Sequence, residues 1–600
     1  MDTFPLAHRI PVNLFVCLTF TCLPVWLAVP LPAAGQGTVE NRAEARELAG
    51  LWAAKLRFGP DIKGTLLIEH SKDGWRAEID GLSAAAGDDD HAIVFELPDG
   101  HGGFRGQLDS SRTRIIGHWI QFMATSGGHN ASPVTLERIG KSERWQGVID
   151  PLDDELTMYL KVEAAADGST HAFLKNPERN IGFFARVATL ERNAQTVRLR
   201  AQRTAKGERE LLSEGVFVDD VLSLPLRGGT YDFERVAADA ASDFYPRSRP
   251  GIGASYRYRA VLPRDDGWPV ATPEEVGMSR AALESLVSTI IDQPIDSLSV
   301  PEIHGILVAR HGKLILEEYF HGEYRDKPHD TRSAAKSVTS VLVGAAIQAG
   351  VPVKVDSHVY EVMNGGAFPE GLEPRKRALT LEHLLTMSSG LDCDDNNDDS
   401  PGNEDKIWEQ SEEPNFSKLT MGLNMIRDPG EKAVYASMQP NLAAGVIRTA
   451  AGRPIPELFH DLVAQPMQIR RYWIGLMPTG EAYMGGGARF LLRDFMKFGQ
   501  LMLNGGTWGK HRVVSQAYAR QDVRVPVVDD RLSVPGKDAA CVLRGRQRRA
   551  GGDGGPGSRS RGRALRWQLQ RSRDVLLAAA TGSGVGIARH HREVNRKSLD

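Results

Sequence analysis

Cysteine is scarce in this sequence, which limits what can hold the protein together. Only 4 cysteines occur among 600 residues, and Cys17 and Cys22 lie close to the N-terminus. Cys393 and Cys541 remain, far apart in the chain. A chain of this length buries enough apolar surface to fold without cross-links, so we predict no disulfide scaffold. A single bridge between Cys393 and Cys541 stays open as an alternative.

Metal-ligand patterns are absent as well. The sequence contains neither C-x-x-C nor H-E-x-x-H, and the adjacent pair His590-His591 lacks ligand spacing. Asp88-Asp89-Asp90-His91 could suggest a metal site, but such a charged run is typical of a solvated turn. We therefore expect no metal and no cofactor.

Neither a strong charge nor a second long apolar run is present. The net charge of −3 and the pI near 6.6 give no reason to expect a nucleic-acid partner.

Residues 10–31 are mostly apolar, follow His8-Arg9 and precede the small residues 33–35, which is typical of a secretory signal. Its prolines make it a poor permanent membrane span, although an uncleaved anchor stays open. We predict a signal peptide over residues 1–35 and a secreted or periplasmic protein.

Residues 36–245 alternate apolar and polar positions with a period of two, as strands do. Tight-turn pairs such as Asp73-Gly74 and Asp167-Gly168 separate the alternating runs. After a predicted helix over residues 43–56, we expect strands over residues 65–70, 92–97, 114–122, 134–139, 145–149, 156–162, 183–190, 196–201, 216–224 and 230–236. This pattern predicts an antiparallel all-β domain, a barrel or a sandwich, whose role the sequence does not reveal. Residues 246–266 are predicted to be a linker.

The clearest chemical signal is an S-x-x-K pair, Ser333 and Lys336. The residues after it repeat apolar side chains at helical spacing until Gly350 and Pro352 end the helix. Side chains three apart share one face of a helix, so the serine hydroxyl and the lysine amine can meet. Lysine can take the serine proton only when neutral, which burial favours by lowering its pKa. The helix N-terminus would also stabilise developing negative charge.

The elements predicted on either side of the S-x-x-K helix follow a recognisable order. A predicted helix over residues 280–291 precedes a hairpin of residues 305–309 and 313–317, and the S-x-x-K helix follows. Further blocks are residues 379–391, residues 429–437 and the glycine-rich stretch 485–499. Over residues 267–521 the chain resembles the β-lactamase-related serine hydrolases: class C β-lactamases, D-alanyl-D-alanine carboxypeptidases, family VIII esterases and 6-aminohexanoate-dimer hydrolases.

This resemblance implies an α+β domain of the serine β-lactamase and penicillin-binding-protein type over residues 267–600. It also implies that Ser333 is the nucleophile and that Tyr435, 102 positions later (435 − 333), works with Lys336 on the serine proton. Ser437 stands where the family often has asparagine and would hydrogen-bond the substrate or Lys336. A glycine-rich phosphate loop is the rival interpretation of residues 485–487, but the G-x-G-x-x-G order is missing.

One family feature is missing from the sequence. The resemblance implies a third motif, K-T-G or H-x-G, on a strand beside Ser333, and residues 542–573 are instead rich in arginine and glycine. Residues 574–582 again resemble the last strand of the family. A local reading-frame error or a genuine lesion would explain this break, and a basic binding loop is the least favoured explanation.

Taken together, these features predict an exported serine hydrolase that cleaves an ester, a β-lactam or a D-amino-acid peptide through a Ser333 acyl-enzyme. Its partner would be a small-molecule ester, amide or peptide. The alternatives are a catalytically impaired binding or sensor protein, because the third motif is missing, and a penicillin binder that acylates without turnover. The sequence makes no prediction of oligomeric state.

Overall fold

The computed structural model describes residues 39–60, 62–89, 92–176, 185–202, 209–226, 229–237, 243–247, 256–293, 303–520, 540–542, 575–581 and 584–590. The predicted signal peptide and nearly all of the arginine-rich segment 542–573 lie outside these residues. No helix in the described ranges is long and apolar enough to cross a membrane.

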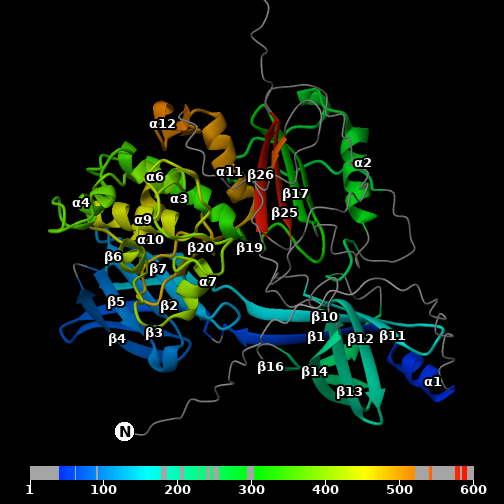
Figure 1. Cartoon of the computed structure of the whole chain (residues 1–600). Helices are drawn as coiled ribbons and strands as arrows, with labels where there is room; N and C mark the ends of the chain where they lie inside the picture. Colours follow the sequence, from blue (N-terminus) through cyan, green and yellow to red (C-terminus); the bar gives the residue numbers. More distant parts are fainter. Residues whose placement is uncertain are drawn as a thin grey trace, which may run out of the picture.

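The N-terminal region contains a closed antiparallel barrel, called here the first barrel (Figure 1). Apolar side chains that alternate along its strands, Trp52 and Leu160 among them, point inward and form its core. Helix α1 (Val39–Leu48) packs against β10 and β12. Its strands are β1 (Gly50–Gly59), β10 (Asp154–Ala164), β11 (Thr170–Lys175), β12 (Ala185–Asn193), β13 (Thr196–Gln202), β14 (Arg209–Val218), β15 (Val221–Leu226) and β16 (Gly229–Arg235).

A second ring of strands is inserted in the chain between β1 and β10. Its neighbours pair in sequence order, and β9 pairs with both β2 and β8, which closes the ring. We call this ring the second barrel, and it has its own apolar core. Its strands are β2 (Gly64–Ser71), β3 (Gly74–Ile79), β4 (Leu82–Asp89), β5 (Ala92–Glu96), β6 (Gly103–Leu108), β7 (Arg114–Met123), β8 (Gly128–Arg138) and β9 (Arg144–Ile149), with the short turn η1 (Pro98–Gly100) after β5.

The predicted antiparallel β fold is confirmed, but two of its predicted elements are wrong. The expected helix over residues 43–56 ends at Leu48, and β1 follows at once because it pairs with β10 along most of its length. The expected strand over residues 216–224 is a hairpin, since Asp219 and Asp220 adopt positive φ and reverse the chain between β14 and β15. Long-range strand pairing overrides local helix propensity in the first case.

The α+β region begins with the turn η2 (Glu274–Val276). Part of it is built on a sheet with the strand order β18-β17-β25-β26-β24, whose strands come from two distant parts of the chain. Helix α2 (Arg280–Ile291) packs on one face through Leu283 and Val287, and α11 (Leu492–Leu503) packs against β17, β25 and β26. The strands are β17 (Ile303–Arg310), β18 (Lys313–Tyr319), β24 (Ala540–Val542), β25 (Val575–Thr581) and β26 (Gly584–His590).

Helices form the rest of this region around the buried helix α3 (Ala335–Gln348), which packs against α9. Apolar side chains surround α3 on nearly all sides, so its position is held by the main core of the molecule. The other elements here are η3 (Arg332–Ala334), α4 (Val359–Met363), α5 (Pro374–Arg377), α6 (Leu381–Leu385), α7 (Glu404–Glu409), α8 (Phe416–Gly422), α9 (Met438–Ala451), α10 (Ile455–Phe459), η4 (His460–Ala464), β22 (Thr507–Trp508), β23 (His511–Arg512) and α12 (Gln516–Arg520).

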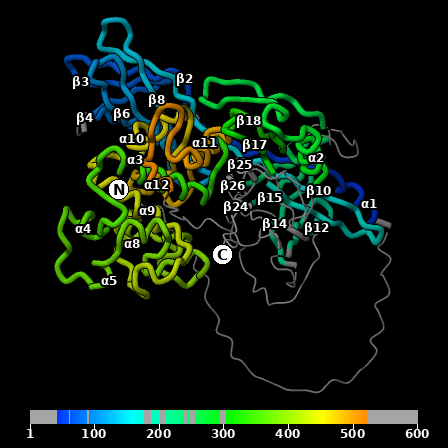
Figure 2. Tube along the Cα trace, turned by 90° about the horizontal axis from the view of Figure 1, so that it is seen from above, coloured from blue at the N-terminus to red at the C-terminus, as the bar shows by residue number. Residues whose placement is uncertain are grey.

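The second barrel is joined to the α+β region by one continuous sheet. Strand β8 pairs with β20 (Tyr472–Leu476), which leads through β21 (Arg489–Phe490) to β19 (His329–Asp330). Asn130 of β8 accepts a hydrogen bond from the buried Arg489 side chain at 3.1 Å. In Figures 1 and 2 the second barrel accordingly lies against the helical part. The strand that precedes Ser333 thus belongs to a sheet that reaches into the N-terminal region.

Candidate active site

Ser333 lies in the turn η3, which runs directly into α3. Thr331 anchors this turn, because its hydroxyl donates to the Ala488 carbonyl at 2.7 Å. Arg332, the residue before the serine, has φ of +48°, a left-handed conformation that costs energy for a residue with a side chain. The turn leaves Ser333 half-buried at the N-terminal end of the helix, where the sequence predicted it.

Lys336 contacts Ser333 as the S-x-x-K spacing predicts. Its ammonium donates to Ser333 Oγ at 3.0 Å and to the Gly485 carbonyl at 2.5 Å. The lysine side chain is fully buried, so these two acceptors replace water around its charge. The lysine nitrogen therefore lies within hydrogen-bonding distance of the serine hydroxyl, and it could accept the serine proton only after losing its own.

The pKa of Lys336 differs in direction from the expectation. Burial lowers it, as the sequence analysis supposed, but Tyr435, Glu404 and Asp395 raise it and outweigh the burial. The net effect is a raised pKa, which keeps Lys336 protonated in this structure. The condition stated from the sequence, that Lys336 acts as a base only when neutral, is therefore not met by burial alone, because Tyr435, Glu404 and Asp395 oppose it.

Tyr435 lies beside the lysine. The Lys336 ammonium is 5.0 Å from the centre of the tyrosine ring. The Tyr435 hydroxyl oxygen is buried and has no hydrogen-bond partner among the described residues. A buried hydroxyl without a partner is unusual in a folded protein and is found where a ligand or reacting group completes the bonding. Ser333, Lys336 and Tyr435 are thus brought together by α3 and the segment that leads into α9.

Ser437 has different partners from those expected. Its side chain is fully buried, and its hydroxyl lies 2.7 Å from Asp395 Oδ2 and 2.9 Å from Glu404 Oε2. Its backbone N–H also donates to Asp395 Oδ2 at 2.7 Å. In this structure the hydroxyl therefore faces two carboxyl groups, and its role toward substrate stays a prediction.

Asp395, Glu404 and Tyr483 are site residues that the sequence analysis missed. The Tyr483 hydroxyl donates to Glu404 Oε1, and the Asp395 backbone N–H donates to the Tyr435 carbonyl at 2.9 Å. Both acidic residues come from the polar stretch 392–405. An acidic run in a loop usually faces solvent, so only its closeness to a family motif could have drawn attention to it.

The glycine-rich stretch 485–487 lies against the same residues. A Cβ atom on Gly485 would come within 2.5 Å of the Ser437 carbonyl oxygen and 2.6 Å of the Tyr483 hydroxyl. Only glycine fits there, because the backbone itself must reach Lys336. The stretch contributes a carbonyl acceptor to the site, which does not fit the rival interpretation of a phosphate loop, where N–H donors bind the ligand.

The strand beside the Ser333 turn is β26, which lies close to both η3 and β19. Its sequence, Gly-Val-Gly-Ile-Ala-Arg-His, contains neither K-T-G nor H-x-G. Strand β25, which the resemblance identified as the family's last strand, lies between β17 and β26 and pairs with both. The position of the third motif is thus occupied by a strand without that motif.

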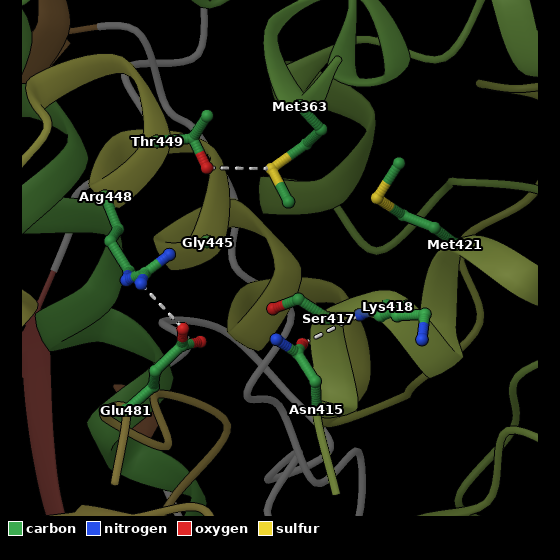
Figure 3. Close-up of a pocket in the computed structure, with 9 residues that line it drawn as sticks. All are labelled: Met363, Asn415, Ser417, Lys418, Met421, Gly445, Arg448, Thr449 and Glu481. Carbon is green, nitrogen blue, oxygen red and sulfur yellow. Dashed lines mark hydrogen bonds and ion pairs between the residues drawn. The ribbon is translucent and has the colours of Figure 1, made fainter. Parts of the chain in front are cut away.

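Other features do not coincide with these residues. A cavity of about 260 Å³ between α4, α8 and α9 is lined by none of the predicted site residues (Figure 3). Arg448 and Glu481 form an ion pair across it at 2.8 Å.

Cys393 is a buried free thiol, so the alternative of a bridge to Cys541 is wrong. Within the described ranges, no three His, Cys, Asp or Glu side chains are arranged to hold a metal ion.

The α+β domain has a serine at the N-terminal end of a helix, and a buried lysine donates a hydrogen bond to it. This is the architecture of hydrolases that use a serine nucleophile. Residues 291–582 match the family model described as Beta-lactamase. This part of the chain therefore carries a region that matches the beta-lactamase family, in line with the resemblance seen in the sequence. No curated protein sequence matches the chain significantly.

Solved structures with similar folds share little sequence with this chain. A candidate 6-aminohexanoate-dimer hydrolase from Bacillus anthracis is 17% identical, with a TM-score of 0.33, over 44% of this chain and 66% of its own length. EstCE1, a hydrolase with promiscuous acyltransferase activity, is 18% identical, with a TM-score of 0.31, over 40% and 76%. A penicillin-binding protein from Bacillus halodurans is 13% identical, with a TM-score of 0.31, over 48% and 91%. At these scores the similarities carry no argument about substrate.

Proposed function

We propose that this protein is an exported hydrolase that cleaves an ester or amide through an acyl-enzyme on Ser333. The substrate class covers short-chain esters, β-lactams and D-amino-acid amides or peptides, since all of these are open to attack by an activated serine. The observation that carries the proposal is the 3.0 Å contact between the Lys336 ammonium and Ser333 Oγ. Export is proposed from the composition of residues 1–35.

In the first half-reaction, Ser333 Oγ forms a bond to the substrate carbonyl carbon while its proton passes to whichever of Lys336 and Tyr435 has already lost its own proton. The negative charge on the carbonyl oxygen is stabilised by the Ser333 backbone N–H, with a second donor expected from the neighbouring strand. The bond to the leaving alcohol or amine then breaks, and the leaving group takes a proton from Tyr435. In the second half-reaction, water attacks the acyl-enzyme carbonyl carbon and gives a proton to Tyr435, and the bond between that carbon and Ser333 Oγ breaks. Ser333 Oγ takes the proton back from Tyr435, and the acyl group leaves as a carboxylic acid.

A binding or sensor protein without turnover is the second candidate. The absence of K-T-G and H-x-G from β26 favours it, because the family uses that motif to hold the substrate beside the serine. In that case the serine and lysine would remain in place while no product is released. The two candidates therefore differ in turnover rather than in fold.

Intact-mass spectrometry of the purified full chain, before and after a fluorophosphonate probe, tests the proposal. We expect one adduct, mapped by peptide analysis to Ser333, its loss in Ser333→Ala, and its retention in Ser337→Ala, a matched control one residue beyond Lys336. Ser333-dependent release of product from nitrophenyl esters, a chromogenic β-lactam or a D-amino-acid amide excludes the sensor candidate. A folded protein without the adduct, or an unchanged adduct in Ser333→Ala, refutes the proposed mechanism.

A further inference from the structure

Two carboxyl groups meet at one hydroxyl close to the proposed base. Ser437 Oγ lies 2.7 Å from Asp395 Oδ2 and 2.9 Å from Glu404 Oε2. Asp395 and Ser437 are buried, and the Glu404 backbone N–H donates to Asp395 Oδ1 at 3.0 Å. The Tyr483 hydroxyl donates to the other oxygen of Glu404. Glu404 is half-buried, so the network is only partly shielded from water.

The number of hydrogens decides how this network can be charged. A serine hydroxyl has one hydrogen and can donate it to only one of the two carboxyl oxygens. The second contact becomes a hydrogen bond only if that carboxyl group carries a proton and donates it to Ser437 Oγ. Two carboxylates at this separation also repel each other strongly in a buried site. Burial first, and the charge of Glu404 second, raise the pKa of Asp395 to about 6.

The charge of this network acts on the proposed catalytic base. Lys336 from α3 and Tyr435 from the segment before α9 face it, as do Tyr483 and the buried thiol of Cys393. Burial raises the pKa of Tyr483 well above its usual range and that of Cys393 to about 12, so both stay neutral near pH 7. Glu404 and Asp395 both favour the charged form of Lys336. The total charge of Asp395 and Glu404 therefore influences the pKa of Lys336.

We propose that Asp395 and Glu404 hold one proton between them through the Ser437 hydroxyl, and that the charge left on the pair sets the pH above which the Lys336–Tyr435 base is active. This inference rests on the proposed function, because it assigns a task to three residues that support the base. Asp395, Glu404 and Ser437 are positioning residues, since they act through Lys336 and Tyr435 rather than on the substrate.

The direction of the effect follows from the charge beside Lys336. Negative charge near Lys336 makes its ammonium harder to deprotonate. Glu404→Gln removes one charge and keeps the contacts, since the glutamine amide can accept from Tyr483 and donate to Ser437. The acidic limb of the rate–pH profile should then move to lower pH by about one unit.

The rate of Ser333 modification by a fluorophosphonate, followed by intact mass from about pH 6 to about pH 12, measures this shift, because the ordinary lysine pKa is about 10.4. Glu409→Gln is the matched control, because Glu409 lies on the same helix as Glu404 and is exposed. We expect the midpoint of the acidic limb to fall in Glu404→Gln and to stay at the wild-type value in Glu409→Gln. Asp395→Asn, which removes the other charge, replaces Glu404→Gln if that variant does not fold.

Equal midpoints in wild type, Glu404→Gln and Asp395→Asn, with Ser333 still modified in all three, overturn the inference and leave the proposed function standing. A lower rate at every pH with an unchanged midpoint also overturns it, because that result indicates a purely structural role. Failure of wild-type Ser333 to react at any pH overturns the proposed function and the inference with it.

Discussion

Replacement of Gly485 by alanine tests whether backbone packing around Lys336 sustains the site. The added Cβ would lie 2.5 Å from the Ser437 carbonyl oxygen, where ordinary contacts begin at 3.4 Å. A shift of about 0.9 Å is therefore needed, and it must come from backbone, either at the start of α9 or at Gly485 itself. Overpacking of this kind costs about 1–3 kcal/mol of unfolding free energy. Because the Gly485 carbonyl accepts from Lys336 at 2.5 Å, the shift also displaces the lysine.

We expect Gly485→Ala to slow Ser333 modification by a fluorophosphonate by about 10- to 100-fold, the usual effect of moving a catalytic group by about 1 Å. Intact mass measures the rate, and urea denaturation measures the stability. Gly486→Ala is the matched control, since its Cβ would meet nothing closer than the Arg332 carbonyl oxygen at 3.7 Å. If Gly485→Ala reacts as fast as Gly486→Ala and is as stable, the packing argument is refuted.

Two further substitutions examine other parts of the structure. Tyr435→Phe removes a hydroxyl that has no hydrogen-bond partner in the described residues, so the unfolding free energy should change by less than about 0.5 kcal/mol. Ser333 modification should slow by at least about 100-fold. An unchanged rate would contradict the role proposed for Tyr435. Asn130→Ala leaves the buried Arg489 guanidinium without this acceptor and should lower the unfolding free energy by about 1–3 kcal/mol in urea. Asn130→Asp keeps an acceptor and should retain most of the stability, and equal losses in both variants would argue against this bond as the cause.

Local patterns predicted much of the fold. The helix over residues 280–291 and the hairpin around His311-Gly312 are present as expected, because capping residues and tight turns act over a few neighbours. The two barrels were predicted only as one β-rich domain. Their separation depends on which distant strands pair, and β1 pairs with β10 about a hundred residues away. Alternation along a strand predicts its exposed and buried faces but does not identify its partner.

The site residues likewise fall into those that local spacing predicted and those that it did not. Ser333 and Lys336 are three residues apart, so the geometry of one helical turn brings them together, and the sequence alone predicted their contact. Tyr435 came from the family resemblance rather than from physical reasoning. Ser437 was expected to face the substrate or Lys336, whereas in the structure its hydroxyl lies between two carboxyl groups.

The sequence by itself predicted the class of fold and the contact between Ser333 and Lys336, because each of these depends on short-range patterns of residues. That Ser333 is the nucleophile and that the third motif is missing stay predictions. Only the tertiary structure placed Tyr435, Glu404 and Asp395 beside Lys336, where together they raise the lysine pKa against the lowering effect of burial. Electrostatic interactions depend on distance in space, and the chain reaches these carboxyl groups about sixty residues after the lysine. For the same reason, the sheet that joins the second barrel to the strand before Ser333 could be seen only after the chain had folded.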